Sequence, residues 1–157
     1  MRRLVPPRRL TILAVALLAA LFAAACGARG PEPIVLNEDP CDFCRMTISD
    51  SRFGGEVVLA TGRVKKFDSV ECLASWARSA AGKGGGTLYV IDLQHPGSFV
   101  PATTAGFLKG ATLKSPMGQA ILSFADTARA EQQRTMLGGT VLTWAQLLAE
   151  STAPGTP

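Results

Sequence analysis

Histidine is scarce in this 157-residue chain, and the side-chain sets of common hydrolytic enzymes are missing. The single histidine, His95, precedes a proline in an expected loop, where we predict an exposed side chain without a ligand role. No Ser-His-Asp set and no pair of catalytic carboxylates stands out. The glycines at residues 84–86 lack the Lys-Ser/Thr that follows in a phosphate-binding loop, so they indicate a linker.

Most of the chain also has no excess of acidic or basic residues. The formal net charge is +4, and the four arginines within the first nine residues account for all of it. Beyond residue 25 the acidic and basic residues balance, and Lys65-Lys66 is a short basic pair that a solvated strand edge explains. We therefore expect no nucleic-acid partner.

A long apolar run occurs only near the N-terminus, at residues 10–25, which are apolar apart from Thr11. The run is shorter than the roughly 20 residues that a membrane-spanning helix needs. Because arginines precede it and small residues end it, the run predicts a secretory signal peptide over residues 1–25.

The end of this segment, Ala-Ala-Ala-Cys-Gly at residues 23–27, resembles the lipobox of bacterial lipoproteins, although alanine stands where that motif prefers leucine. The resemblance implies that Cys26 is lipidated and becomes the mature N-terminus. Two or three acyl chains suffice for stable anchoring, so we expect a protein of the cell envelope that faces the periplasm or the cell exterior. The alternative is an ordinary signal peptide that is cleaved beside an incidental cysteine.

The rest of the chain, 132 residues from Cys26 on, is enough for one compact domain or two very small ones. Residues 26–40 are rich in Gly, Pro and charge and predict a flexible tether, and residues 151–157 predict a similar tail. Between them we expect an α+β fold made of two similar ββαβ units, at residues 41–97 and 98–150.

The first unit is predicted from a change of period along the chain. Short strands at 56–60 and 63–67 flank a hairpin turn, and a helix over 68–80 follows, with Ser69 as a possible N-cap and Asp68 as another capping candidate. A β-rich run at 87–93 completes the unit.

The second half of the chain is predicted to repeat this order of elements. It has strands at 99–105 and 107–113, a helix that includes 121–125, and a strand at 140–142. Aligning residues 75–77 with 123–125 places Met117 at the start of the second helix. This predicts an internal duplication, and generic α+β patterning is the alternative. Residues 142–148 suit either a closing helical turn or more strand.

Sulfur carries most of the available chemistry, in Cys41, Cys44, Met46, Cys72 and Met117. Thiolate and thioether together select Cu(I), whereas zinc sites prefer Cys and His. On an extended strand residues two apart face the same side, so Cys44 and Met46 can meet one ion. Cys41 lies in a turn after a proline and can add a second thiolate.

Each of these side chains also has a simpler interpretation. A CxxC pair outside the cytoplasm is more often a disulfide or a redox pair than a metal site. Cys72 near a helix N-terminus would have a lowered pKa, but it also suits a small core residue. Met117 is either a thioether ligand from the second unit or core filling at a helix entry between Pro116 and Gly118.

Taken together, these motifs resemble the NosL family, the lipoprotein accessory proteins of nitrous oxide reductase. The resemblance is carried by residues 41–48 (CDFCRMTI), 67–73 (FDSVECL) and 115–118 (SPMG), with Gly62 and Phe124-Ala125. It implies two ββαβ units related to the organomercurial-lyase fold. It also implies a non-enzymatic role, in which Cu(I) is delivered through a membrane ABC-type complex toward the reductase.

Carried over residue by residue, the family's C-x-M element falls on Cys44 and Met46, and its Pro-Met-Gly element falls on Met117. Arg45 stands where the family motif has glycine, and Cys41 is an additional thiol. These departures leave open another copper client or a disulfide between Cys41 and Cys44.

Three competing functions follow from the same residues. A thiol-disulfide oxidoreductase would use Cys41 and Cys44 with Cys72 as resolving thiol, but a thioredoxin-like CxxC opens a helix, and residues 45–48 predict strand. An organomercurial lyase would use cysteines with an acid. A purely structural lipoprotein would hold a Cys41–Cys44 disulfide.

Overall fold

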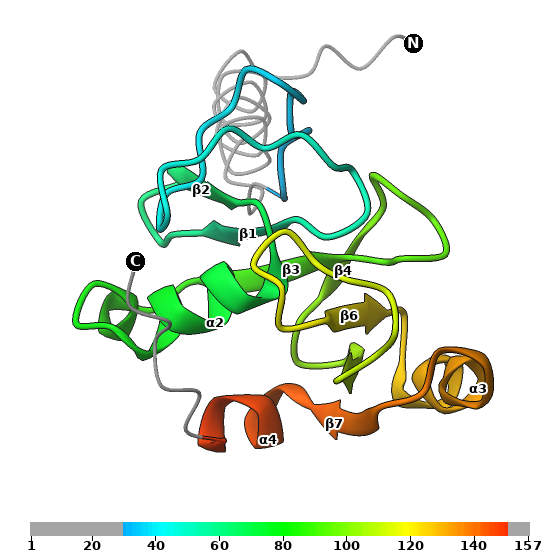
Figure 1. Ribbon diagram of the computed structural model, residues 1–157. Helices are drawn as coiled ribbons and strands as arrows, with labels where there is room; N and C mark the ends of the chain where they lie inside the picture. Colours follow the sequence, from blue (N-terminus) through cyan, green and yellow to red (C-terminus); the bar gives the residue numbers. More distant parts are fainter. Residues whose placement is uncertain (1–29, 151–157) are drawn as a thin grey trace, which may run out of the picture.

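The computed structural model describes residues 30–150, in which two small antiparallel sheets pack around shared helices (Figure 1). The predicted signal peptide, Cys26 and the tail after residue 150 lie outside the described residues. Within the described range no helix is long and apolar enough to cross a membrane. The α+β class predicted from the sequence is confirmed.

The first sheet has the strand order β2-β1-β3-β4, with all neighbours antiparallel. Its elements are β1 Gly55–Val58, β2 Val64–Phe67, α2 Val70–Arg78, the short 3-10 turn η1 Gly82–Gly84, β3 Thr87–Ile91 and β4 Phe99–Pro101. Gly62 closes the β1–β2 hairpin at a φ of 80°, which suits glycine. The predicted ββαβ order of the first unit is confirmed.

The second sheet has the order β6-β5-β7, which repeats the order β2-β1-β3 of the first. Its elements are β5 Gly106–Lys109, β6 Ile121–Phe124, α3 Thr127–Leu137, β7 Thr140–Thr143 and α4 Trp144–Ala149. Helix α4 settles the open assignment at residues 142–148, because Thr143 and Gln146 form a capping box at its start.

The helix predicted at residues 121–125 is wrong, because this segment is strand β6 and helix α3 begins at Thr127. All four β6 residues are buried, and a short, fully apolar run does not distinguish strand from helix by its period. Gly55 pairs with Phe67 as Gly106 pairs with Phe124, which aligns Phe67 with Phe124. The predicted alignment was therefore shifted, and Met117 lies in the β5–β6 loop instead of a helix.

Strand β4 was expected to open the second unit, but it pairs with β3 and extends the first sheet. The flexible tether predicted through Pro40 is also wrong for its described part. The backbone N–H of Glu32 donates to Glu56 Oε2 (2.8 Å), Lys66 Nζ donates to the Pro33 carbonyl (2.7 Å), and Ile34 packs against the core. The hydrogen bonds and the apolar burial hold this segment against the domain, and neither can be predicted from its Gly, Pro and charge content alone.

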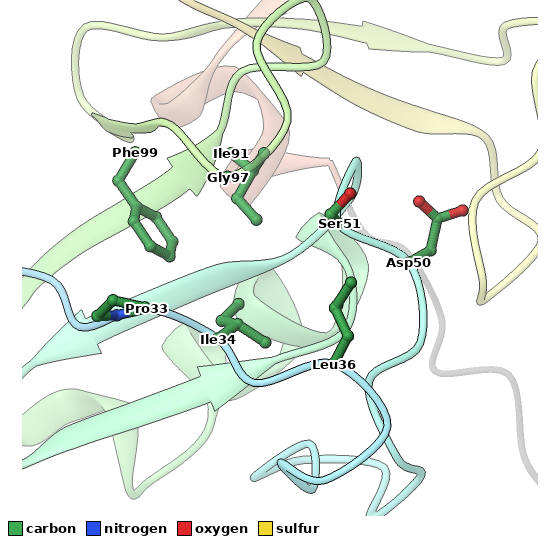
Figure 2. A pocket seen from close by; sticks show the side chains of 8 residues that line it. All are labelled: Pro33, Ile34, Leu36, Asp50, Ser51, Ile91, Gly97 and Phe99. Carbon is green, nitrogen blue, oxygen red and sulfur yellow. The ribbon is translucent and has the colours of Figure 1, made fainter.

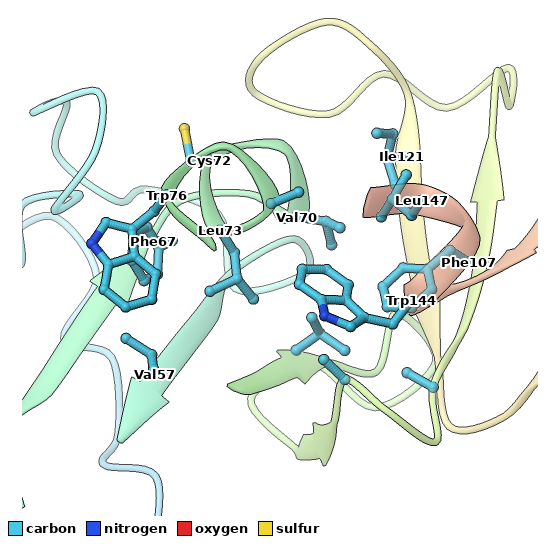
Figure 3. Packing of buried hydrophobic residues seen from close by; sticks show 14 of the residues in the cluster. Val57, Phe67, Val70, Cys72, Leu73, Trp76, Phe107, Ile121, Trp144 and Leu147 are labelled. Carbon is cyan, nitrogen blue, oxygen red and sulfur yellow. The ribbon is translucent and has the colours of Figure 1, made fainter. Parts of the chain in front are cut away.

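Helix α2 lies between the two sheets and supplies the centre of the main core (Figure 3). Phe67 and Trp76 gather on one side of Leu73, and Phe107 and Trp144 gather on the other. A second cluster, which includes Phe53, Leu108, Leu122, Phe124 and Ala130, fills the space under α3. Gly106 lets α3 approach closely, since a Cβ there would lie 2.4 Å from the Asp126 carbonyl oxygen.

Candidate metal centre

The CxxC segment forms a tight turn that is attached to the edge of the first sheet. The backbone N–H of Arg45 donates to the Cys41 carbonyl (3.0 Å), and Arg45 has a φ of 67°. Asp42 holds the turn against β2, because its carboxylate accepts the Lys66 N–H (3.0 Å) and the Lys65 ammonium (2.9 Å). This brings Cys41 and Cys44 to the end of β2, where the chain enters α2.

The junction between β2 and α2 contributes the other two side chains of the site. Ser69 is the N-cap of α2, and its Oγ accepts the backbone N–H of Cys72 (3.3 Å). Asp68 does not cap the helix, which corrects one reading of the sequence. Its Oδ2 instead accepts a hydrogen bond from the Cys44 thiol (3.6 Å), so the carboxylate faces the CxxC turn.

Four potential ligand atoms converge at this junction, the sulfurs of Cys41, Cys44 and Cys72 and a carboxylate oxygen of Asp68. They all lie within 4.8 Å of one another. Cys44 is half-buried, and the other three side chains are buried. All three cysteines are free thiols, so the two sulfurs of the CxxC pair are not joined in this structure.

The pKa values of the three cysteines are shifted in different directions. A hydrogen bond from the Cys72 thiol is the main reason that the pKa of Cys41 is lowered to about 6. Backbone N–H groups of Phe43, Cys44 and Asp68 add to this effect, and burial opposes it. Such converging N–H groups favour an anion, so Cys41 is the cysteine at which this site most favours the thiolate form.

The other two cysteines remain protonated. Burial is the main reason that the pKa of Cys44 rises to about 11, and the charges of Cys41 and Asp68 add to it. The pKa of Cys72 is raised first by its hydrogen bond to Cys41, and then by burial and Asp68. The prediction that the pKa of Cys72 is lowered near the helix N-terminus is wrong, because the hydrogen bond to Cys41, burial and Asp68 all raise it.

The two predicted thioether ligands lie at the surface. Met46 is 55% exposed and Met117 is 37% exposed. The extended strand predicted for Cys44 and Met46 is absent, because the left-handed φ of Arg45 interrupts the alternation between them. Met46 nevertheless follows Cys44 by two residues, and its side chain is exposed.

The loop that carries Met117 is attached to the first turn of α2. Ser115 Oγ donates to Glu71 Oε1, and the backbone N–H of Ile121 donates to the same oxygen (3.3 Å). Glu71 is buried beside Cys72, and burial is the main reason that its pKa is raised. The Glu71–Ser115 contact therefore ties the Met117 loop to the helix turn that carries Cys72.

Two other features lie apart from this cluster. The His95 ring is exposed, as predicted, and its Nδ1 lies 2.8 Å from Asp92 Oδ2. A hollow of about 90 Å³ lies between the N-terminal segment and β4, and it shares no residue with the cysteine cluster (Figure 2). Pro33, Ile34, Leu36, Ile91 and Phe99 are its main apolar lining.

The sequence interpretation missed the ligand potential of Asp68. The signal was its position between strand residue Phe67 and N-cap Ser69, where a carboxylate at a strand end can face a neighbouring loop. The cluster thus offers three cysteine sulfurs and a carboxylate, which is a donor set for a soft or borderline metal ion.

A family model described as NosL matches residues 34–152, which includes nearly all of the described fold. The chain belongs to the NosL family. It is 33% identical over 152 residues to the copper-binding lipoprotein NosL of Stutzerimonas stutzeri, covering 87% of this chain and 78% of that protein.

The fold is also similar to a solved NosL-family structure. The crystal structure of the copper chaperone NosL from Shewanella denitrificans matches with a TM-score of 0.66 and 24% sequence identity. The match covers 76% of this chain and 96% of the other. It supports the α+β fold predicted from the sequence, which the structure forms as two small antiparallel sheets.

Proposed function

We propose that this NosL-family chain is a Cu(I)-binding lipoprotein of the cell envelope that delivers copper for the maturation of nitrous oxide reductase. The observation that carries the proposal is the half-buried Cys44 thiol, placed beside the Cys41 thiolate and followed by the exposed thioether of Met46. Thiolate and thioether sulfur are the ligands that select Cu(I). The relatives named for copper binding support the same cargo.

Cys44, Met46 and Met117 are the leading copper ligands, with Cys41 and Cys72 as further thiols on the buried side. Cu(I) reaches the site from the surface, where the two thioethers are exposed. Cys44 loses its proton as the ion binds, since the thiolate is the form that ligates metal. A site with few protein ligands and solvent access permits release by ligand exchange, as a carrier requires.

The partner in this proposal is a membrane ABC-type complex that receives copper and passes it toward the reductase. A lipid on Cys26 would keep the chain at the membrane surface, with the Cu(I) site facing the periplasm or the cell exterior. The name of the Stutzerimonas stutzeri relative, a lipoprotein, supports this location.

Anaerobic Cu(I) titration of the full chain in detergent, in competition with a chromophoric chelator, tests the proposal. We expect tight stoichiometric binding that is lost in the Cys44→Ala/Met46→Ala variant. Met136→Ala is the control, because this methionine is exposed on α3, outside the proposed ligand set. If the double variant binds Cu(I) as tightly as the wild type, the ligand assignment is wrong.

A thiol-disulfide oxidoreductase is the second candidate, favoured by the low pKa of Cys41 beside two free thiols. Two observations weigh against it. Cys41 is buried, and the CxxC pair lies in a turn instead of opening a helix. A redox titration that shows a reversible Cys41–Cys44 couple, together with no affinity for Cu(I), would favour the enzyme.

A further inference from the structure

Glu71 is a buried acid that lies outside the proposed set of copper ligands. The residue is 4% exposed, and its Oε2 has no hydrogen-bond partner among the described residues. Burying a carboxyl group with one oxygen unpaired is costly, and an apolar side chain would fill the same space at a lower cost. What distinguishes Glu71 is the set of contacts made by its other oxygen, Oε1.

This one oxygen holds the chain on both sides of Met117. Two residues before Met117, Ser115 Oγ donates a hydrogen bond to Glu71 Oε1. Four residues after it, the backbone N–H of Ile121, the first residue of β6, donates to the same oxygen (3.3 Å). The segment between these two bonds is therefore closed on a single acceptor atom.

The backbone next to Met117 is hydrogen-bonded as well. Ser115 Oγ accepts the Ala120 N–H (3.2 Å), and the Ser115 carbonyl accepts the Gly118 N–H (2.9 Å). A bond between residues three apart closes a β-turn, in which Met117 is the third residue. Gly118 follows at a φ of 75°, which suits glycine. The position of Met117 is thus set by a network that begins at Glu71.

Glu71 also connects this network to the cysteine cluster. It lies in the first turn of α2, directly before Cys72, which belongs to the cluster. Met117 lies in the β5–β6 loop of the second sheet, whereas the cluster lies at the end of β2 in the first sheet. The contacts of Glu71 therefore join the Met117 loop of one sheet to the thiols of the other.

We propose that Glu71 is a positioning residue for Met117, which holds the chain on both sides of this methionine against the start of α2 and so orders its thioether before Cu(I) binds. The inference rests on the proposed function, because it takes Met117 as a copper ligand. A group that is already ordered loses less conformational freedom on binding, so Cu(I) affinity should depend on a contact that the ion does not touch.

The second unit of the fold shows that the buried acid is not required by the fold. Aligning N-cap Ser69 with N-cap Asp126 places Ala128 at the position of Glu71, and the first turn of α3 contains no acidic residue. Both helices nevertheless start with a side-chain cap. The carboxyl group is therefore a feature of the unit that carries the cysteine cluster.

Amide hydrogen exchange, followed by NMR on the metal-free, reduced full chain in detergent, tests whether the contact orders the loop. In Ser115→Ala the amides of Gly118 and Ala120 should exchange about tenfold faster than in the wild type, because the loop opens more easily. Ser123→Ala is the matched control. Ser123 is also buried, and its Oγ donates to the Ile91 carbonyl (2.6 Å) at another contact between the sheets. It should leave both exchange rates unchanged.

Anaerobic Cu(I) titration of the same proteins against a chromophoric chelator tests the effect on the site. Loss of a group that orients a metal ligand weakens affinity by about 10–100-fold, so Ser115→Ala should bind Cu(I) at least about tenfold more weakly. Ser123→Ala should bind Cu(I) as the wild type does. Glu71→Ala is a second variant that should lose affinity, and Glu71→Gln should restore it, because the amide keeps an acceptor oxygen.

A double-mutant cycle separates positioning from a general loss of stability. In a Met117→Ala background, Ser115→Ala should cause no further loss of Cu(I) affinity, since both changes act through one ligand. Equal losses with and without Met117 would overturn the positioning role, as would unchanged loop exchange in Ser115→Ala.

The two proposals fail separately in these measurements. A wild type that does not bind Cu(I) would remove the proposed function. A wild type that binds Cu(I), together with Ser115→Ala and Glu71→Ala variants that bind it equally tightly, would overturn only the role of Glu71.

Discussion

At the scale of single residues, Arg45 and Glu56 are held in a backbone conformation and in surroundings that are energetically unfavourable for these residue types. Arg45 adopts a left-handed φ of 67° at the centre of the C-x-M element. Glu56 lies on the central strand β1 without solvent contact, and its Oε1 has no partner among the described residues. For each residue we predict how a substitution changes the free energy of unfolding in the absence of metal.

Replacing Arg45 by glycine should stabilise the protein by about 0.5–1 kcal/mol, because the relief of left-handed strain exceeds the added entropy of the unfolded chain. Urea denaturation of the metal-free, reduced protein measures this change. Lys114→Gly is the control, since Lys114 is exposed in a loop and is not among the described residues with positive φ. It should have no stabilising effect, and equal stabilisation of both variants would contradict the role of the Arg45 backbone.

Glu56 makes stability fall as the pH rises. Burial is the main cause that raises its pKa to about 7 from an ordinary value of 4.5. Below about pH 4.5 the carboxyl is protonated in both folded and unfolded states, whereas above pH 7 the folded state must bury the charge. The lost stability approaches about 3 kcal/mol at alkaline pH. Glu56→Gln should remove this fall in urea denaturations between pH 5 and pH 8, and an unchanged pH profile would contradict it.

At the scale of elements, the two helices that follow the second strand of each unit start in the same way. Ser69 caps α2 by accepting the Cys72 N–H, and Asp126 caps α3 by accepting the Arg129 N–H. Only the first of these caps lies under the cysteine cluster. Because the order of strands and helix is repeated in the two sheets, the effect of a cap on stability can be measured apart from its effect on the site.

The substitutions Ser69→Ala and Asp126→Ala should each lower the free energy of unfolding by about 1 kcal/mol, because each removes an N-cap acceptor. Ser69→Ala should also weaken metal binding, since Ser69 fixes the turn that carries Cys72. Asp126→Ala should leave the Cu(I) affinity unchanged. Thermal unfolding and metal titration measure the two effects, and equal losses of metal affinity in both variants would show that stability alone is responsible.

At the scale of the whole molecule, the two sheets share one core through α2. Leu73 is fully buried between Trp76 on the side of the first sheet and Trp144 on the side of the second (Figure 3). Backbone and side-chain hydrogen bonds also join the sheets, because Leu93 N–H donates to the Ser123 carbonyl (2.9 Å) and Ser123 Oγ donates to the Ile91 carbonyl (2.6 Å). The sheets should unfold as one cooperative unit.

Leu73→Ala should lower the stability of both halves together, by about 2–5 kcal/mol, because it leaves a cavity in the shared core. Two reporter proteins, Trp76→Phe and Trp144→Phe, each keep one tryptophan and follow one side of that core by fluorescence. The transitions seen by the two reporters should coincide, with and without Leu73→Ala. Separate midpoints would show two independent units.

The sequence by itself was sufficient for the elements that have strong local signals. The hairpin at Gly62, the Ser69 cap and the ββαβ order of the first unit follow from turn chemistry, capping and periodicity, which act between neighbouring residues. The sulfur-rich candidates, Cys41, Cys44 and Cys72, were also found from residue type alone, and the structure brings all three together. The motifs were sufficient to indicate the NosL family, which the family match confirms.

Only the tertiary structure decided the features that depend on distant partners. Strand β6 was predicted as helix because both of its faces are buried, Ile121 in the main core and Leu122 and Phe124 in the second cluster, which a local period cannot show. The place of Asp68 in the cluster and the protonation order of the thiols depend on the CxxC turn folding against the β2–α2 junction. Sequence therefore determined which chemical groups are present, and tertiary contacts determined which of them meet and in which charge state, because electrostatic and coordination effects act through space and not along the chain.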